Sequence, residues 1–396
     1  MKKTLIALTL AALPVASMAE VTLFGTIKGG AEFTKTKGVK NTVTNLNDWD
    51  SSIGFKGEED LGNGLKAIWQ LQSKASIDAK SGRNGQRNNL TSFIGLDAGT
   101  FGKIRAGNLP DAIKDMGDLN LDDSGHGVRA LDNTWERTGT RHTAVRYDSA
   151  NFGGFSFNLL YSPEDNQRYD QLRSEHGVGD LGNFEGVTGI VDENYPNWQT
   201  RNSRVASIGL NYSIAGFFVK YGFVHQNDVR HYAPPVDNIG YNRIVHRIMG
   251  GYDANNLFVG LGYQYTYGHD ADELKTHELA LSAAYRIGNV VPRFTYVHGF
   301  KDKKGTEIRY SENYTDLAGV QHNKGDLFKD TTADSNSKYH QVVLGADYYL
   351  SKRTTVIASL GWLKEGDGRK SAIIGNVTDR AKEQAYSFGL GLRHKF

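Results

Sequence analysis

The chain ends in the stretch AYSFGLGLRHKF, residues 385–396, in which apolar residues alternate with small or polar ones. One parity carries Tyr386, Phe388, Leu390, Leu392, His394 and Phe396, and the other carries Ser387, Gly389, Gly391, Arg393 and Lys395. Successive side chains of a β-strand point to opposite faces, so the stretch predicts a strand with one largely apolar face. Because the chain stops at an aromatic residue and not in a polar tail, something apolar must receive this face.

The other end of the chain predicts export. Residues 1–19, MKKTLIALTLAALPVASMA, contain two lysines, an apolar stretch and small residues, which is the layout of a cleaved secretory signal peptide. The apolar part is much shorter than the roughly 20 residues of a membrane-spanning helix, and Pro14 interrupts it, which argues against a retained anchor. We therefore expect a single mature domain over residues 20–396.

Composition excludes several classes of protein. Removal of the signal takes away Lys2 and Lys3, so the formal net charge of +2 falls to zero and no basic surplus for nucleic-acid binding remains. The chain has no cysteine, so no disulfide framework supports an exported fold. Mean hydropathy is −0.49, and no apolar run of helix length follows the signal.

Alternation continues through the whole mature chain. In VTLFGTIKGGAEF (21–33) and LKAIWQLQSK (65–74), most apolar residues share one parity, and most polar residues share the other. Repeated segments of about ten such residues, separated by Gly, Asn and Asp, are typical of a transmembrane antiparallel β-barrel. A water-soluble β-sandwich also alternates, but it does not need so many strands of near-equal length.

The links between these segments also alternate in length. Short links occur at 60–64, 98–102, 149–154, 213–216, 254–256, 287–290 and 350–354. Long polar links occur at about 34–47, 75–88, 109–139, 163–200, 226–242, 268–275, 301–337 and 364–382. This predicts an all-β barrel of about 16 strands, with short periplasmic turns at one end, long outer loops at the other, and a water-filled lumen.

Closure of such a barrel requires the last strand to pair with the first, because unpaired backbone groups in hydrocarbon cost several kcal/mol each. Aromatic residues near strand ends are expected at the two membrane interfaces. Those that suit these girdles are Trp49, Trp69, Tyr348 and Trp362.

Several long stretches make a family resemblance specific. SSIGFKGEEDLGNGLKAIWQLQ (51–72), SFIGLDAGTFGKIRAGN (92–108), AVRYDSANFGGFSFNLLYS (144–162), YYLSKRTTVIASL (348–360) and the terminal GLGLRHKF resemble the general porins of beta-proteobacteria, of which the neisserial porins are the familiar type. The resemblance covers essentially the whole mature chain. It departs at Asn89-Leu90-Thr91, where the family commonly has Asn-Arg-Gln, so a pore-wall arginine is missing unless Arg83 or Arg87 replaces it.

The resemblance implies a homotrimeric porin in the outer membrane of a Gram-negative bacterium, in contact with outer-membrane lipid and lipopolysaccharide. It also implies that loop 3 folds into the lumen, and that Phe396 is part of the signal read by the outer-membrane assembly machinery. The passing solutes would be ions and small hydrophilic molecules, with no nucleic-acid partner.

Parity predicts which charged side chains line the pore wall. If Ile104, Ala106, Val145 and Tyr147 face outward, the lumen receives the side chains of Lys103, Arg105, His142 and Arg146. The wall predicted in this way is mostly basic.

Loop 3, residues 109–139, is acidic and leaves the strand that carries Arg105. Its candidate constriction carboxylates are Asp115, Asp118, Asp122, Asp123 and Glu136. If loop 3 folds inward as the resemblance implies, these carboxylates oppose the wall arginines and create a transverse field that filters ions. The alternative is that they only solvate a polar surface.

Other motifs do not indicate chemistry. Residues 62–67 match a dinucleotide-binding G-x-G-x-x-A pattern, but they form a predicted hairpin turn with no helix after it. A calcium-loop pattern beginning at Asp118 fails, because its sixth position is Asp123 and its twelfth is Arg129. We therefore expect no metal, no cofactor and no catalytic set.

The sequence thus favours a general diffusion porin with a modest preference for anions. Two other classes remain open, namely an outer-membrane barrel enzyme with its catalytic residues at the rim, and an adhesin that uses the long links at 163–200 and 301–337. Enzyme barrels tend to have fewer strands and a plugged lumen, which disfavours the first.

Overall fold

The structure is a computed structural model. It describes residues 20–78, 90–117, 119, 139–163, 204–227, 242–269, 274–303, 308–309, 313–315, 321–329, 337–366 and 384–396. The predicted signal peptide, residues 1–19, lies outside the described residues.

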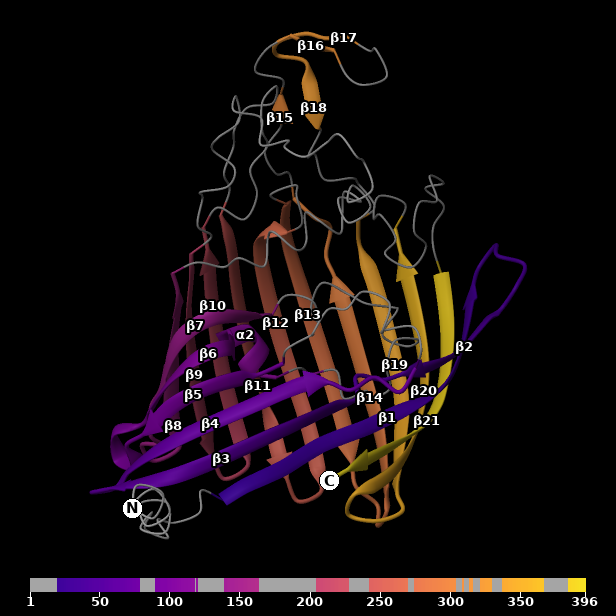
Figure 1. Ribbon diagram of the computed structural model, residues 1–396. Coiled ribbons are helices and arrows are strands. Elements are labelled where there is room, and N and C mark those ends of the chain that lie inside the picture. The colour runs from indigo at the N-terminus through magenta and orange to yellow at the C-terminus, as the bar shows by residue number, and fades with distance from the viewer. Residues whose placement is uncertain are drawn as a thin grey trace, which may run out of the picture.

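The fold is a closed antiparallel β-barrel (Figure 1). Its wall is formed by β1 (Glu20–Thr36), β2 (Val43–Asp48), β3 (Ser52–Gly62), β4 (Leu65–Lys74), β5 (Ser92–Asp97), β6 (Lys103–Pro110), β7 (Arg141–Asp148), β8 (Phe155–Ser162), β9 (Val205–Ile214), β10 (Phe217–Gln226), β11 (Arg243–Ala254), β12 (Leu257–His269), β13 (Leu274–Tyr285), β14 (Val290–Gly299), β19 (Tyr339–Tyr349), β20 (Thr354–Glu365) and β21 (Gln384–Lys395). Apart from β2 and β3, which both pair with β1, each wall strand pairs with the wall strands before and after it. β21 pairs with β1 over Thr26–Thr36, which confirms the predicted closure.

These 17 strands form sixteen wall positions, because β2 and β3 together occupy one. Both pair with the same edge of β1, with β3 along its first half and β2 along its second. Between them, Asp50 has a φ of +67°, which interrupts the ladder. The predicted count of about 16 strands is therefore confirmed, with one strand broken in the middle.

The predicted short turns all connect neighbouring strands. Three of them are two-residue hairpins, Asn63-Gly64, Ala215-Gly216 and Asn255-Asn256, with positive φ at both positions. This is the backbone of a type I′ turn, which matches the twist of paired strands. All seven short links lie at one end of the barrel, and the strand ends that precede and follow the long links lie at the other (Figure 1).

Two predicted long links are shorter than expected. The link predicted at 34–47 shrinks to residues 37–42, because β1 continues to Thr36 and β2 begins at Val43. The link predicted at 268–275 is reduced to residues 270–273. Polar strand ends continue to pair beyond the apolar band, so a change in polarity does not mark the end of a strand.

Outside the wall, short paired segments occur in the link after β14. They are β15 (Ile308–Arg309) with β18 (Leu327–Lys329), and β16 (Tyr314–Thr315) with β17 (Gln321–His322). No helix in the described residues is long and apolar enough to cross a membrane.

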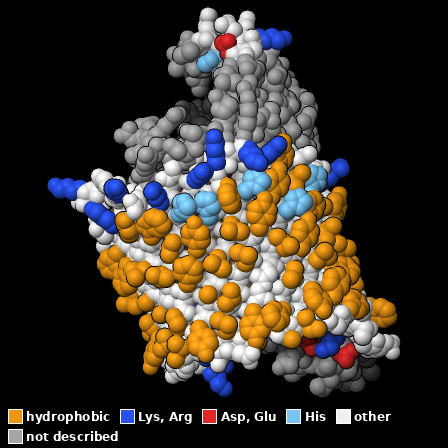
Figure 2. Space-filling view, turned by 180° about the vertical axis from the view of Figure 1, so that it is seen from behind, with side chains coloured by type: hydrophobic (Ala, Val, Ile, Leu, Met, Phe, Trp, Pro, Cys, Tyr) orange, Lys and Arg blue, Asp and Glu red, His pale blue; other side chains and the backbone are white. Residues whose placement is uncertain are grey.

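Burial follows the predicted parity. On β21, Tyr386, Phe388, Leu390 and Leu392 are exposed on the outside of the barrel, whereas the residues between them are mostly buried. The same outward apolar parity covers most of the wall and forms a continuous band on the barrel surface (Figure 2). An exposed apolar band on a closed barrel suits a lipid environment.

Trp49 corrects one sequence expectation. It was predicted at a membrane interface, but its side chain is 0% exposed. Its indole ring lies where a Cβ on Gly30 or Gly391 would be, 2.7 Å and 2.3 Å from the nearest ring atoms. These glycines are partners on β1 and β21 and face inward, so Trp49 covers the closure seam from inside. The break after β2 turns the ring inward, which parity alone cannot reveal.

Candidate pore constriction

The candidate site begins where the chain leaves the wall between β6 and β7. After Pro110 come Asp111 and the short helix α2 (Ala112–Asp115), and the chain returns to β7 through Thr140. Asp111 caps α2 by accepting a bond from the Lys114 amide at 2.7 Å. It also accepts one from the Thr140 amide at 3.0 Å, and its own amide donates to the Thr140 carbonyl at 2.9 Å. Asp111 therefore closes the base of the predicted loop 3.

His142 contacts this base. Its Nε2 atom lies 3.4 Å from Asp111 Oδ2, and both side chains are almost completely buried. The inward orientation predicted for His142 agrees with this position. The imidazole supports the base of the loop, and it is not exposed as a charge in an open pore.

Two arginines and two aspartates form a connected network on the inner wall. Arg105 Nε and Nη2 donate to Asp148 Oδ2 at 3.0 Å and 2.6 Å. Arg146 Nε and Nη2 donate to Asp148 Oδ1 at 2.9 Å and 2.6 Å, and Nη2 also donates to Asp115 Oδ2 at 2.6 Å. The two positive and two negative charges compensate one another.

Arg146 is the centre of this network. In addition to both carboxylates, Nη1 donates to the Pro110 carbonyl at 2.8 Å, and the side chain is only 2% exposed. Asp115, at 36%, is the most exposed member. Asp115 therefore contacts Arg146 directly, and this pair does not face each other across an open gap.

The remaining wall residue of the predicted set is paired near the short-turn end. Lys103 Nζ lies 2.8 Å from Asp97 Oδ2 and is half exposed. Arg105 also lies over the ring of the inward-facing Phe93, with Cζ 5.0 Å from the ring centroid. Parity predicted the orientation of these cations but missed their partners Asp97 and Asp148. The i, i+2 spacing of Arg146 and Asp148 is the signal that could have identified the second partner.

Inward side chains of strands between β9 and β14 bind the backbone of Ala112, Met116, Gly117 and Leu119. Ser207 on β9 accepts a bond from the Ala112 amide at 3.2 Å. Lys220 on β10 donates to the Met116 carbonyl at 3.0 Å, and Arg247 on β11 donates to the Gly117 carbonyl at 3.4 Å. Ser282 on β13 and Thr295 on β14 both donate to the Leu119 carbonyl, Thr295 at 3.4 Å. Five strands thus hold this short segment against the wall.

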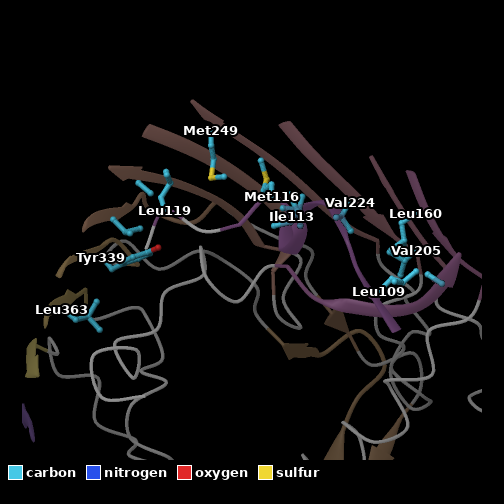
Figure 3. Close-up of a cluster of buried hydrophobic side chains, with 14 of the residues drawn as sticks. Leu109, Ile113, Met116, Leu119, Leu160, Val205, Val224, Met249, Tyr339 and Leu363 are labelled. Atoms are coloured by element: carbon cyan, nitrogen blue, oxygen red, sulfur yellow. The ribbon is translucent and has the colours of Figure 1, made fainter. Parts of the chain in front are cut away.

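Apolar packing supports the same placement (Figure 3). A Cβ on Gly222 would lie 2.9 Å from Ile113 Cδ1 and 3.0 Å from Met116 Sδ. A Cβ on Gly260 would lie 2.5 Å from Leu119 Cδ2. The two glycines therefore leave depressions in the inner wall that these side chains fill. Sequence reading expected a polar lumen and missed this apolar bed.

A buried chain of hydrogen bonds begins at Arg247, beside the apolar bed. Arg247 Nε donates to Gln264 Oε1 at 2.8 Å, and Gln264 Nε2 donates to Glu278 Oε2 at 2.8 Å. The Tyr339 hydroxyl donates to the other oxygen of Glu278. Glu278 therefore stabilises the positive charge of the buried Arg247 through the intervening amide.

The other loop carboxylates predicted for the site, Asp118, Asp122, Asp123 and Glu136, lie outside the described residues, as do Arg83 and Arg87. Thr91, where the family resemblance expects a different side chain, accepts a hydrogen bond from Arg141 Nε at 3.0 Å. Among the described residues, no group of three or more His, Asp or Glu side chains could hold a metal ion.

Comparisons with known proteins agree with this architecture. The family model for Gram-negative porins matches residues 20–396. The chain is 38% identical to the major outer membrane protein P.IB of Neisseria lactamica over 412 residues, and 37% identical to that of Neisseria gonorrhoeae, with all of each chain covered.

Among solved structures, the chain resembles OmpF of Salmonella typhi in complex with daunomycin, with a TM-score of 0.59, 17% identity, and coverage of 96% of this chain and 98% of that one. It also resembles the outer membrane channel DcaP of Acinetobacter baumannii, with a TM-score of 0.60, 13% identity, and coverage of 96% and 97%. A trimer form of OmpT of Vibrio cholerae has a TM-score of 0.55, 13% identity, and coverage of 96% and 99%.

Proposed function

The chain belongs to the Gram-negative porin family and is an outer-membrane porin; we propose that the segment 109–139 narrows its water-filled lumen. The observation that carries the proposal is the set of bonds from inward side chains of β9, β10, β11, β13 and β14 to the backbone of residues 112–119. Bonds from inward side chains of five strands support a path of this segment along the inside of the barrel.

The proposed constriction has Arg105 and Arg146 on its wall side and Asp115, Asp118, Asp122, Asp123 and Glu136 on the loop side. Arg146 holds the segment, because it is buried and bonded to Pro110, Asp115 and Asp148. Replacing Arg105 and Arg146 together by Gln would leave Asp115 and Asp148 uncompensated. We therefore expect the reversal potential under a salt gradient to shift toward cations, most strongly in dilute salt.

Planar-bilayer recording tests both parts of this proposal. The wild-type protein should form open, conductive pores, which a barrel enzyme or an adhesin without a channel would not. An R105Q/R146Q variant with unchanged selectivity in dilute salt would remove these arginines from the constriction. R353Q, at a short turn and outside the network, is the matched control and should leave selectivity unchanged.

We also propose a modest anion preference that comes from inward cations without a carboxylate partner. Lys56 and Arg286 are exposed on the inner parity and form no salt bridge with any described residue. Lys220 binds a carbonyl group and forms no salt bridge with a carboxylate of the described residues. Asp253 is an inward carboxylate that forms no salt bridge within the same described residues, so the excess of positive charge is small.

We propose that the protein assembles as a homotrimer. Its interface is the side of the barrel formed by the short strands β5, β6, β7 and β8. β5 has 6 residues and β6, β7 and β8 have 8 each, against 12 or 13 in β11, β12 and β13. Six residues extend about 20 Å and, when tilted, span about 15 Å, less than the apolar band of about 25 Å. This side needs cover other than lipid.

Two highly exposed apolar side chains lie on the same side. Ile94 on β5 is 70% exposed and Phe101, in the β5–β6 turn, is 80% exposed. A second copy of the chain would bury them. Unboiled protein should migrate as a compact trimer on a detergent gel, and I94E should convert it to monomer while V219E, on β10, should not. Monomeric wild type in every mild detergent would contradict the proposal.

A further inference from the structure

Two phenylalanine rings lie next to each other on the inner wall, between the apolar bed and the short turns. Phe218 is the second residue of β10, and Phe258 is the second residue of β12. Their ring centroids are 6.0 Å apart, and the ring planes are inclined by only 18°. Both rings are half-buried, and they share the inward parity of Gly222 and Gly260 in the bed. We call this pair the aromatic platform.

A glycine on the strand between them makes room for the platform. Gly251 on β11 is the register partner of Phe218 on one side and of Gly260 on the other. A Cβ on Gly251 would lie 2.8 Å from Phe218 Cζ, and a Cβ on Gly260 would lie 3.2 Å from Phe258 Cζ. The absence of side chains at these positions therefore lets both rings lie along the wall beside the segment 112–119.

A lysine on the same strand face supplies positive charge beside the platform. Lys220 follows Phe218 at the next inward position of β10, and its Nζ lies 5.8 Å from the centroid of the Phe218 ring. Nζ donates to the Met116 carbonyl at 3.0 Å. An ammonium group has three hydrogens, so donors remain for a second partner. No carboxylate of the described residues forms a salt bridge with Lys220.

An arginine lies on the other side of the platform, toward the short turns. Phe258 is the register partner of Ala284, and Arg286 is the next inward residue of β13. Such diagonal neighbours on paired strands are within reach of long side chains. Arg286 Cζ lies 4.4 Å from the centroid of the Tyr349 ring, and Arg286 forms no salt bridge within the described part of the chain. The platform is thus flanked by cations on both sides.

Other aromatic groups of the barrel lack this combination. Arg105 lies over the inward ring of Phe93, but Asp148 already compensates its charge. Phe33 and Phe388 form a similar pair, with centroids 6.1 Å apart and planes inclined by 23°, but both are exposed on the outer face. The platform therefore combines two adjacent rings, an inward position and a cation that no described carboxylate compensates.

We propose that the platform binds small aromatic carboxylates as they pass through the lumen. The solute ring stacks on Phe218 and Phe258, and its carboxylate accepts a charge-assisted hydrogen bond from Lys220. Asp253 is the register partner of Phe258 on the turn side, so repulsion directs the solute carboxylate toward Lys220. The inference rests on the proposed channel, because solutes reach the inner wall through its lumen.

Fluorine NMR measures this binding without any conductance. Para-fluorobenzoate would be titrated with the purified protein in detergent at neutral pH and low salt. We expect F218L/F258L, which keeps apolar volume and removes both rings, to lower the affinity about fivefold, the ratio that corresponds to the loss of aromatic stacking. K220Q should lower it by about as much, because it removes the charged donor.

A neutral probe separates the contributions of the rings and of the charge. Para-fluorobenzyl alcohol has the same ring and no carboxylate, so F218L/F258L should weaken its binding and K220Q should leave it unchanged. K220R restores the positive charge and should recover most of the affinity for para-fluorobenzoate. D253N removes the opposing carboxylate and should tighten binding of para-fluorobenzoate by about twofold in low salt.

The matched control is F33L/F388L, which removes the similar pair of rings from the outer face. It should bind para-fluorobenzoate as the wild type does, and it corrects for partition of the probe into detergent. Cyclohexanecarboxylate, which has the charge but no aromatic ring, should compete weakly. Unchanged affinity in both F218L/F258L and K220Q, or equal competition by cyclohexanecarboxylate and benzoate, would overturn the proposal.

Planar-bilayer recording keeps the channel and the binding site apart. Benzoate should reduce the wild-type conductance reversibly, and it should reduce the conductance of F218L/F258L less. A wild type that conducts but shows no binding in the NMR titration would leave the proposed channel intact and overturn the aromatic site. A wild type that binds para-fluorobenzoate through the platform but does not conduct would contradict the channel and support the site.

Discussion

The closure seam between β1 and β21 and the apolar bed at Gly222 and Gly260 are two regions of the inner wall where glycines leave space. In each region a large side chain from a different part of the chain fills that space. At the seam, the glycine pair Gly30 and Gly391 is covered by Trp49, which comes from the adjacent broken strand. In the bed, Gly222 and Gly260 are covered by Ile113, Met116 and Leu119 from the segment between β6 and β7. Both regions use glycine to create space and a large side chain to fill it.

The two regions differ in which part of the structure the buried side chain stabilises. Trp49 packs across the pair of strands that closes the barrel, so its burial stabilises the barrel itself. Leu119 is bonded to Ser282, 163 positions away along the chain, so its burial stabilises the position of a segment inside a finished barrel. We therefore expect changes at the seam to affect stability and changes in the bed to affect conductance.

The largest expected effect is at the seam. W49A should lower the stability of the barrel by about 3–5 kcal/mol, as for other buried tryptophans, and lower the temperature at which the gel mobility shifts on heating. The control W362A removes a half-exposed tryptophan from the outer face and should have a much smaller effect. Equal shifts in the two variants would show that Trp49 does not stabilise closure.

Phe396 tests the same seam during assembly. Its backbone amide and carbonyl bond to Gly25 at 3.1 Å and 3.0 Å, and its ring packs on that glycine. F396A retains the backbone bonds and removes only the ring, whereas deletion removes both. Both variants should give several-fold less protein in the outer membrane, with wild-type conductance for the molecules that insert. Normal yield of F396A would show that the aromatic ring has no role in assembly.

In the bed, G260V should change the pore more than the barrel. Its Cβ would lie 2.5 Å from Leu119, so the segment must shift, at a cost of about 1–3 kcal/mol. Single-channel conductance should change while the heating shift stays within a few degrees of wild type. G250A, at a nearby glycine whose Cβ would meet nothing closer than 3.4 Å, is the control. Unchanged conductance in G260V would contradict the proposed link between the bed and the pore.

A smaller effect is expected for D115N. It removes the carboxylate that binds Arg146 at 2.6 Å and leaves one positive charge uncompensated, so selectivity should move toward anions. The reversal potential measured at low and high salt checks this, because screening over about 8 Å in physiological salt weakens the effect. D326N, in the long link before β19, should leave selectivity unchanged. A shift toward cations would contradict the charge balance of the network.

The smallest effect should come from K56Q/R286Q, which removes two exposed inward cations at a distance from the bed. We expect a slight loss of anion preference in dilute salt and none at high salt. K338Q/K364Q removes the same charge from the outer surface and should give no change in phosphatidylcholine bilayers. Equal shifts in the two pairs would mean that the inward position of the charges is irrelevant.

The strand architecture could be predicted from sequence because alternation and turns are local. Parity identified the outward face of β21, the seven short links identified the hairpins, and closure followed from the need to pair every strand edge. The inward orientation of Lys103, Arg105, His142 and Arg146 came from the same rule. The signal peptide and the roles of Asp118, Asp122, Asp123 and Glu136 stay predictions.

What those inward side chains contact was decided by the tertiary structure. Parity placed Arg146 in the lumen but could not show that Asp148, Asp115 and Pro110 surround it. It placed Trp49 at the membrane interface, whereas the break after β2 turns the ring onto the seam. The apolar bed for Leu119 has no local signature at all. A strand pattern repeats every two residues, but these contacts join positions that meet only after the barrel has closed.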